Sequence, residues 1–134
     1  MNSKALNRFF AYVFLFSIML FVLALGFSLT KIYNDVKSIC KEAKMEFQTD
    51  CISSLIAYSE SVNHSNKERV KAIWALGQIA DSTALPHLEN LRTLYDCSLV
   101  EDYESYLCYE VEKAIKWCKK GNLTHYMYSR REEW

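Results

Sequence analysis

Cysteine and histidine are the residue types of this chain that could carry redox, nucleophilic or metal chemistry, with five cysteines and three histidines in all. Four cysteines form two equally spaced pairs, Cys40 with Cys51 (51 − 40 = 11) and Cys97 with Cys108 (108 − 97 = 11). That spacing along a straight helix would separate two sulfurs by about 16 Å, so each pair needs a break between its members. Polar segments before Cys51 and before Cys108 offer such breaks. We therefore predict two disulfides that clamp inter-helix turns in an oxidising compartment, with buried free thiols as the alternative.

Cys118 is left over and falls on an apolar helical face, which predicts a buried core thiol. A zinc site of Cys97, Cys108, Cys118 and His125 is the sharper alternative. Its spacings of 11, 10 and 7 (108 − 97, 118 − 108, 125 − 118) include no close Cys-x-x-Cys pair to seed a zinc site. We predict no bound metal and no cofactor.

Catalytic constellations are not evident around the histidines. His64 lies in a turn, His87 in a first helical turn and His125 in the tail, and none is expected to have a nearby serine or cysteine with a third orienting group. The scattered glycines form no phosphate-binding loop, and the acids around Glu101 and Asp102 lack the spacing and turn glycine of an EF-hand. The sequence predicts no enzymatic activity and shows no feature that indicates a small-molecule substrate.

The element that must position these residues begins with an apolar run over residues 9–29, which contains no charge. As a helix rising about 1.5 Å per residue it would span roughly 31 Å, enough to cross a bilayer. A cleaved signal peptide is the alternative, with Lys4 and Arg8 as its basic region and a mature chain beginning at Phe27. The length of the run favours a retained transmembrane helix that binds the lipid bilayer.

Orientation follows from the positive charges beside this run. Lys4, Arg8 and the terminal amine precede it without any acid, whereas Lys31 and Lys37 follow it with Asp35 between them. The positive-inside rule then predicts a cytoplasmic N terminus and a C-terminal domain outside the cytoplasm. That domain would lie in a periplasm, outside the cell or in an organelle lumen. The formal charge of zero gives no electrostatic basis for binding nucleic acid.

Helical periodicity continues after the apolar run, and the single proline and three glycines argue against a turn-rich β fold. The patterns predict one helix pair over 51–62 and 66–80 and a second over 84–95 and 104–120. Gly77 lies inside its helix and is expected to mark a close helix contact. The predicted organisation is a cytoplasmic N terminus over 1–8, a transmembrane helix over 9–29, a stalk helix over 30–48, a helical repeat domain over 49–120 and a tail over 121–134.

The two helix pairs show internal similarity. Aligning Ala72 with Ala114 gives a register of 42 residues (114 − 72), which superposes Glu68 on Glu110. That period lies within the roughly 40–47 residues of HEAT and armadillo repeats. The segment over 68–88 resembles the HEAT-like repeats of the bacterial and phycobilisome-lyase type. The matching residues are Arg69, Ala72, Ala75, Leu76, Gly77, Ile79, Asp81, Ala84, Leu85 and Leu88.

The second repeat departs from the pattern, since Val111 replaces the arginine and Trp117-Cys118-Lys119 replaces Ala-Leu-Gly. The resemblance implies an all-α fold, with the transmembrane helix followed by a short α-solenoid of about two HEAT-like hairpins that serves as a scaffold for protein contacts. Lyase members of the family handle bilin chromophores, so a chromophore- or substrate-handling role is one alternative and a thiol-redox role for Cys118 is another.

HEAT pairs bury their apolar stripes only by stacking, and three or more are usual, so two pairs are marginal and indicate a covering partner. We therefore expect a membrane-anchored adaptor or accessory subunit that binds another protein or a membrane complex. Exposed aromatic side chains are enriched at interfaces. The predicted partner-binding residues are Trp74, Tyr106, Tyr109, Trp117, Tyr126, Tyr128 and Trp134.

Overall fold

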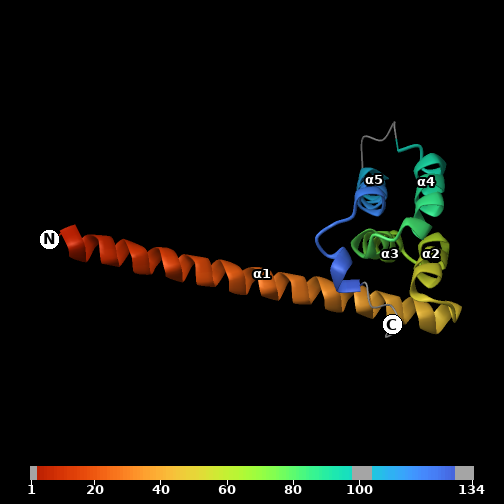
Figure 1. The fold of residues 1–134 in the computed structure, drawn as a ribbon. Helices are drawn as coiled ribbons and strands as arrows, with labels where there is room; N and C mark the ends of the chain where they lie inside the picture. Colours follow the sequence, from red (N-terminus) through yellow and green to blue (C-terminus); the bar gives the residue numbers. More distant parts are fainter. Residues whose placement is uncertain (1–2, 98–103, 129–134) are drawn as a thin grey trace. The chain divides into compact units, whose positions relative to one another are not determined.

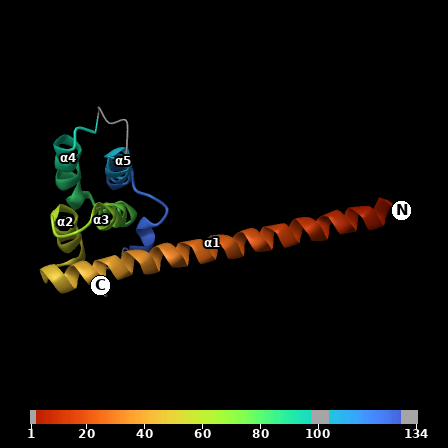
Figure 2. The same ribbon diagram turned by 180° about the vertical axis from the view of Figure 1, so that it is seen from behind.

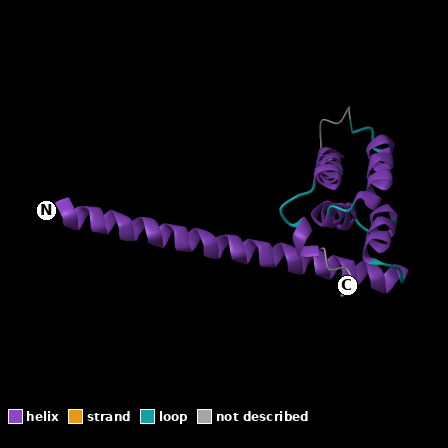
Figure 3. Ribbon diagram, in the orientation of Figure 1, coloured by secondary structure: helices purple, strands orange, loops and turns teal. Residues whose placement is uncertain are grey.

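The computed structural model describes residues 3–97 and 104–128, and every regular element in these ranges is helical (Figure 3). The all-α expectation is confirmed for this part of the chain. The five α-helices are α1 (Ser3–Phe47), α2 (Cys51–Glu60), α3 (Asn66–Ile79), α4 (Leu85–Leu94) and α5 (Glu104–Lys120). Two short 3-10 helices, η1 (Ser82–Ala84) and η2 (His125–Tyr128), complete the order.

The chain divides into two compact units, Met1–Asn34 and Asp35–Trp134. The first unit is the apolar part of α1, whose large side chains are exposed, as Phe27 is at 75 %. Its hydroxyl groups are satisfied within the helix, because Ser17 and Thr30 each donate to the carbonyl four residues earlier at 2.9 Å. Among the described residues, Asn7–Phe47 is the one helix long and apolar enough to cross a membrane.

The second unit contains the two helix pairs. Helix α2 packs on α3, α4 packs on α5, and α3 packs on α5. Figures 1 and 2 show these four helices from opposite sides, with η1 joining the first pair to the second. The pairs correspond to the two helical hairpins expected from the sequence, whereas their assignment as HEAT-like repeats of a solenoid stays a prediction.

The core of this unit takes side chains from every one of its α-helices. The end of α1 contributes Val36, Ile39, Cys40 and Ala43, each at most 2 % exposed. The remaining buried apolar residues of the helix pairs include Leu55, Tyr58, Ala72, Ile73, Ala75, Leu76, Leu88, Leu91, Val111, Ala114 and Ile115.

Gly77 lies at a close approach of α3 to α5. A Cβ atom at this position would be 3.0 Å from the Cα of Ala114 and 3.2 Å from Cε3 of Trp117. Only a residue without a side chain fits this approach without movement, so the predicted close helix contact at Gly77 is confirmed.

Local sequence signals set most helix ends. Asp50 caps α2 by accepting from the amides of Ile52 and Ser53 at 3.1 and 3.2 Å. Ser65 and Glu68 form a reciprocal capping box at the start of α3. Helix α3 ends at Ala80, which adopts a left-handed conformation (φ 56°), and Pro86 occupies the first turn of α4, where its missing N–H costs no hydrogen bond.

Candidate functional site

Ser59, Glu60 and His87 form a hydrogen-bonded line where the end of α2 meets the start of α4. The Oγ of Ser59 lies 2.9 Å from Nε2 of His87, and Nδ1 of His87 lies 2.9 Å from Oε1 of Glu60. This is the connectivity of a Ser–His–acid triad. The expectation that no histidine has a serine and an orienting acid nearby is therefore wrong for His87. This contact has no local signal in the sequence, because Ser59 and His87 are 28 residues apart.

This line of residues is closed to a substrate. Ser59 is 0 % exposed, and its hydroxyl also lies within donating distance of the Ile56 carbonyl at 2.8 Å. One hydroxyl proton thus has two acceptors, and no solvent-accessible face remains for an electrophile. Burial lowers the pKa of His87, against the opposing effect of Glu60, so the imidazole is neutral near pH 7. The arrangement ties α4 to α2 and satisfies buried polar atoms.

Arg69 of α3 extends the hydrogen-bonded line of Ser59, Glu60 and His87. Its Nε donates to the Ser59 carbonyl at 2.9 Å, which satisfies one of the free carbonyls at the end of α2. Its guanidinium also donates to the hydroxyl of Tyr95, at the end of α4, and lies 5.7 Å from the centre of that ring. Arg69, the arginine that matches the predicted HEAT-like pattern, therefore joins the ends of two helices.

A second histidine cluster joins the end of α1 to the turn after α2. Nε2 of His64 lies 2.9 Å from Oε2 of Glu46, and the imidazole stacks on the Tyr58 ring with centroids 3.7 Å apart. The Tyr58 hydroxyl donates to Glu42 at 2.8 Å. Burial and this hydrogen bond raise the pKa of Tyr58, so the phenol stays protonated at physiological pH.

Two disulfides flank these clusters. Cys40 is bonded to Cys51, which links α1 to α2 across the turn that Asp50 caps. Cys97 is bonded to Cys108, which links the end of α4 to α5. Both pairs are those expected from the equal spacings. The Cys97–Cys108 bond takes two of the four ligands of the alternative zinc site. The described residues contain no group of three His, Cys, Asp or Glu side chains that could hold a metal.

Cys118 is buried and is the free cysteine among the described residues. Its Sγ lies 3.9 Å from the Leu76 carbonyl, whereas His125 donates from Nδ1 to the Ile79 carbonyl at 2.9 Å. A lyase-type role would need Cys118 and His125 together, but the two side chains contact different carbonyls of α3. Burial raises the pKa of Cys118 to about 11, which makes its thiolate scarce.

The segment over 122–126 closes the end of α3. The side-chain amide of Asn122 donates to the carbonyls of Gly77 and Gln78 at 2.9 and 3.2 Å. The Thr124 hydroxyl lies 3.1 Å from the Gln78 carbonyl and 2.8 Å from its Oε1. Together with His125, these residues satisfy carbonyls that α3 itself cannot pair. This part of the predicted tail is a fixed element of the folded unit.

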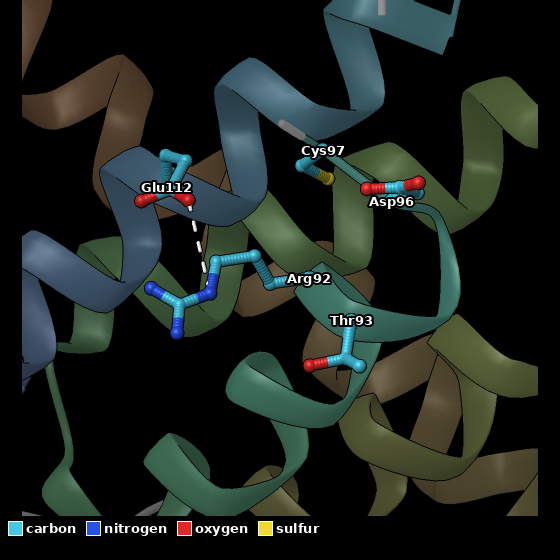
Figure 4. A pocket seen from close by; sticks show the side chains of 5 residues that line it. All are labelled: Arg92, Thr93, Asp96, Cys97 and Glu112. Atoms are coloured by element: carbon cyan, nitrogen blue, oxygen red, sulfur yellow. Dashed lines mark ion pairs between the residues drawn. The ribbon is translucent and has the colours of Figure 1, made fainter. Parts of the chain in front are cut away.

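Arg92, Thr93, Asp96, Cys97 and Glu112 line a pocket of about 380 Å³ between the end of α4 and α5 (Figure 4). Nε of Arg92 lies 3.9 Å from Oε1 of Glu112, and both side chains are about half exposed. The charged side chains of this pocket are one arginine and two acids, and the pocket is open to solvent, so it shows neither the convergent donors nor the enclosure that would select a cofactor.

The other residues that match the predicted HEAT-like pattern cap a helix or pack in the core. Asp81 is buried and caps η1, accepting from the amide and the hydroxyl of Thr83 at 2.7 Å each. Gly77 permits the close α3–α5 approach described above. The other signature residues form part of the core and are Ala72, Ala75, Leu76, Ile79, Ala84 and Leu88, with Leu85 partly exposed.

The predicted partner-binding aromatics differ in their exposure. Tyr106 and Tyr109 are each 60 % exposed on α5, and Tyr126 is 82 % exposed. Trp74 and Trp117 are partly exposed. Tyr128 is 3 % exposed because its ring packs into the folded unit, so its inclusion among surface residues is wrong. Trp134 lies outside the described residues.

Comparisons with protein-family models, with characterised proteins and with solved structures found no match to this chain.

Proposed function

We propose that this chain is a membrane-anchored, HEAT-like interaction module that acts as an adaptor or accessory subunit of a membrane complex and has no catalytic activity of its own. The apolar part of α1 is the anchor, with the N terminus in the cytoplasm and the folded unit outside it. The folded unit presents the surface to which a partner protein binds.

The anchor is supported by the exposure of every large apolar side chain from Phe9 to Phe27. A soluble chain would leave this surface in water at a cost of about 25 cal/mol per Å². The two disulfides support the placement of the folded unit outside the cytoplasm, because thiols are kept reduced in most cytosols.

The observation that carries the interaction role is the pair Leu123 and Tyr126, which are 93 % and 82 % exposed. They alternate with Asn122, Thr124 and His125, whose side chains are fixed to the end of α3. A partner that binds this segment would lose little conformational entropy, since the backbone is already ordered. Exposed apolar side chains on a rigid segment are what an interaction hot spot requires.

The absence of catalytic activity is supported by the state of the reactive groups. The Ser59 hydroxyl is buried, and the Cys118 thiol is both buried and weakly acidic. Neither nucleophile has an accessible face from which to attack a substrate.

The test is co-purification of the tagged full chain from membranes in mild detergent, with quantitative mass spectrometry of bound proteins. The double variant Leu123→Asp/Tyr126→Asp is expected to lose a stoichiometric partner that the unmodified chain retains. Val62→Asp is the matched control, because Val62 is 92 % exposed on a different turn.

Three results would contradict the proposal. A chain that elutes as a clean monomer with no stoichiometric partner argues against an adaptor. Equal loss of the partner from the Val62→Asp control argues against the 122–126 segment as its binding site. A mature N terminus at Phe27, found by mass spectrometry, argues against the anchor.

A further inference from the structure

The outward side of α5 carries aromatic and basic side chains in one line. Tyr106 and Tyr109 are each 60 % exposed, Lys116 and Lys120 are exposed, and Lys113 and Trp117 are partly exposed. Spacings of three and four residues place them on one helical face. We call Tyr106, Tyr109, Lys113, Lys116, Trp117 and Lys120 the aromatic–lysine stripe.

The centre of the stripe is ordered by its own contacts. Nζ of Lys113 lies 5.4 Å from the Tyr109 ring centroid and 4.8 Å from the Trp117 ring centroid. The same Nζ lies 3.2 Å from Oε1 of Glu110, which is 4 % exposed. These contacts order the centre of the stripe, where Tyr109 is exposed and Trp117 is partly exposed.

The stripe has a net positive charge. Its three lysines and the neighbouring Glu110 sum to 3 − 1 = +2. Within the described residues, Lys116 and Lys120 form no ion pair. The other polar side of α5 is neutralised by α4, because Lys119 pairs with Glu89 at 2.7 Å and Glu112 with Arg92 at 3.9 Å. Among the described side chains of α5, the positive charge without an ion pair therefore lies on the stripe.

We propose that the aromatic–lysine stripe binds the anionic headgroups of phospholipids in the membrane that holds α1. This inference rests on the anchor of the proposed function. Residues 30–34, which are part of helix α1, alone separate the apolar run from the folded unit, so the anchor confines the unit to the region next to the headgroups. Tyrosine and tryptophan accumulate at membrane interfaces, and lysine side chains are attracted by anionic headgroups.

The side chains of α5 favour lipid headgroups over the acyl layer, a second copy of the chain or an acidic protein as the binding partner of the stripe. Its apolar face, with Leu107, Val111 and Ala114, is buried in the unit, so no apolar face is left to enter the acyl layer. A second copy packed stripe to stripe would place lysines against lysines. An acidic protein segment has matching charge, but only the lipid surface is brought near by the chain itself.

The experiment uses the full chain in nanodiscs of phosphatidylcholine with about one third phosphatidylglycerol, and in nanodiscs of phosphatidylcholine alone. Trp74→Phe and Trp134→Phe leave Trp117 as the fluorophore, quenched by a spin label on a lipid headgroup. Quenching is expected in the anionic discs, with less in the neutral discs and a decrease at high salt. Lys116→Gln/Lys120→Gln is expected to weaken docking roughly 25-fold, at about fivefold per lysine.

The matched control is Lys67→Gln/Lys71→Gln, which removes two exposed lysines from α3 and is expected to leave quenching unchanged. A photo-crosslinker at Tyr109 in the otherwise unmodified chain gives an independent reading and is expected to form a lipid adduct. An inserted chain with unquenched Trp117 and no lipid adduct overturns this inference but leaves the anchor standing. A protein adduct without lipid assigns the stripe to an acidic partner instead. A chain that does not insert into discs overturns the anchor and this inference together.

Discussion

Substitution of Gly77 tests the central contact of the folded unit. In an isolated helix, Gly77→Ala would stabilise by about 1 kcal/mol, because alanine has the higher helix propensity. Here the new Cβ would lie 3.0 Å from Ala114 Cα and 3.1 Å from Ala114 Cβ, so α5 or α3 must move by a few tenths of an ångström. Overpacking of this kind costs about 1–3 kcal/mol. The net effect is an expected loss of about 0–2 kcal/mol in the free energy of unfolding, and a larger loss for Gly77→Val.

The measurement is chemical unfolding of the full chain in detergent, without reductant, followed by tryptophan fluorescence. Ala114→Gly removes one of the three contacted atoms, so combining it with Gly77→Ala is expected to recover about 1 kcal/mol relative to additivity. Gly26→Ala is the control, since no atom lies within 4 Å of a Cβ added there. A Gly77→Ala chain that is more stable by about 1 kcal/mol would refute the close α3–α5 approach.

Four further outcomes are expected. Cys40→Ser is expected to lower the free energy of unfolding by about 3 kcal/mol, from the entropy of the loop that the disulfide closes, and added reductant should then have a smaller effect on the variant than on the unmodified chain. Burial lowers the pKa of His87, so as pH drops this imidazole is protonated in the unfolded chain before it is protonated in the folded one. The free energy of unfolding should therefore fall as pH drops below 6.5 and stay level above it, and His87→Gln should remove this pH dependence. Because burial raises the pKa of Cys118 to about 11 from 9.0, the folded thiol should react with iodoacetamide at pH 8 roughly a hundredfold more slowly than the unfolded one, and fast alkylation would revive a redox role. Ser65→Ala should cost about 1 kcal/mol in urea unfolding by opening the capping box, and an unchanged midpoint would contradict that cap.

The helices were predictable because their signals are local. Asp50 and Ser65 stand where capping residues are expected, and Pro86 falls within a first turn, so the observed helix ends lie within about two residues of those expected. The disulfides were predictable because equal spacing coincided with breaks in helical pattern. All of these features depend on residues close together in the chain.

The hydrogen-bonded line of Ser59, Glu60 and His87 was not predictable, because Ser59 and His87 are far apart in the chain. Ser59 and His87 look like a helix-end serine and a first-turn histidine, and only the packing of α4 against α2 brings them within 2.9 Å. The hydrogen bonds of the segment over 122–126 were not predictable either, since the sequence there has no clear period. They join Asn122 and Thr124 to the end of α3, which is about 45 residues away in the chain. Periodicity carries no information on such long-range polar contacts.

These contacts change the argument for a partner. Two stacked helix pairs are too few to bury their apolar stripes, which from sequence alone indicates an external cover. The chain supplies much of that cover itself. Val36 and Ile39 of α1 are buried against the unit that Cys40–Cys51 closes, and Tyr128 is buried beyond the end of α5. Incomplete burial of the helix stripes therefore no longer indicates a partner. The case for binding rests instead on the exposed side chains that remain, so disruptive substitutions at Leu123 and Tyr126 should abolish binding while leaving the unfolding transition unchanged.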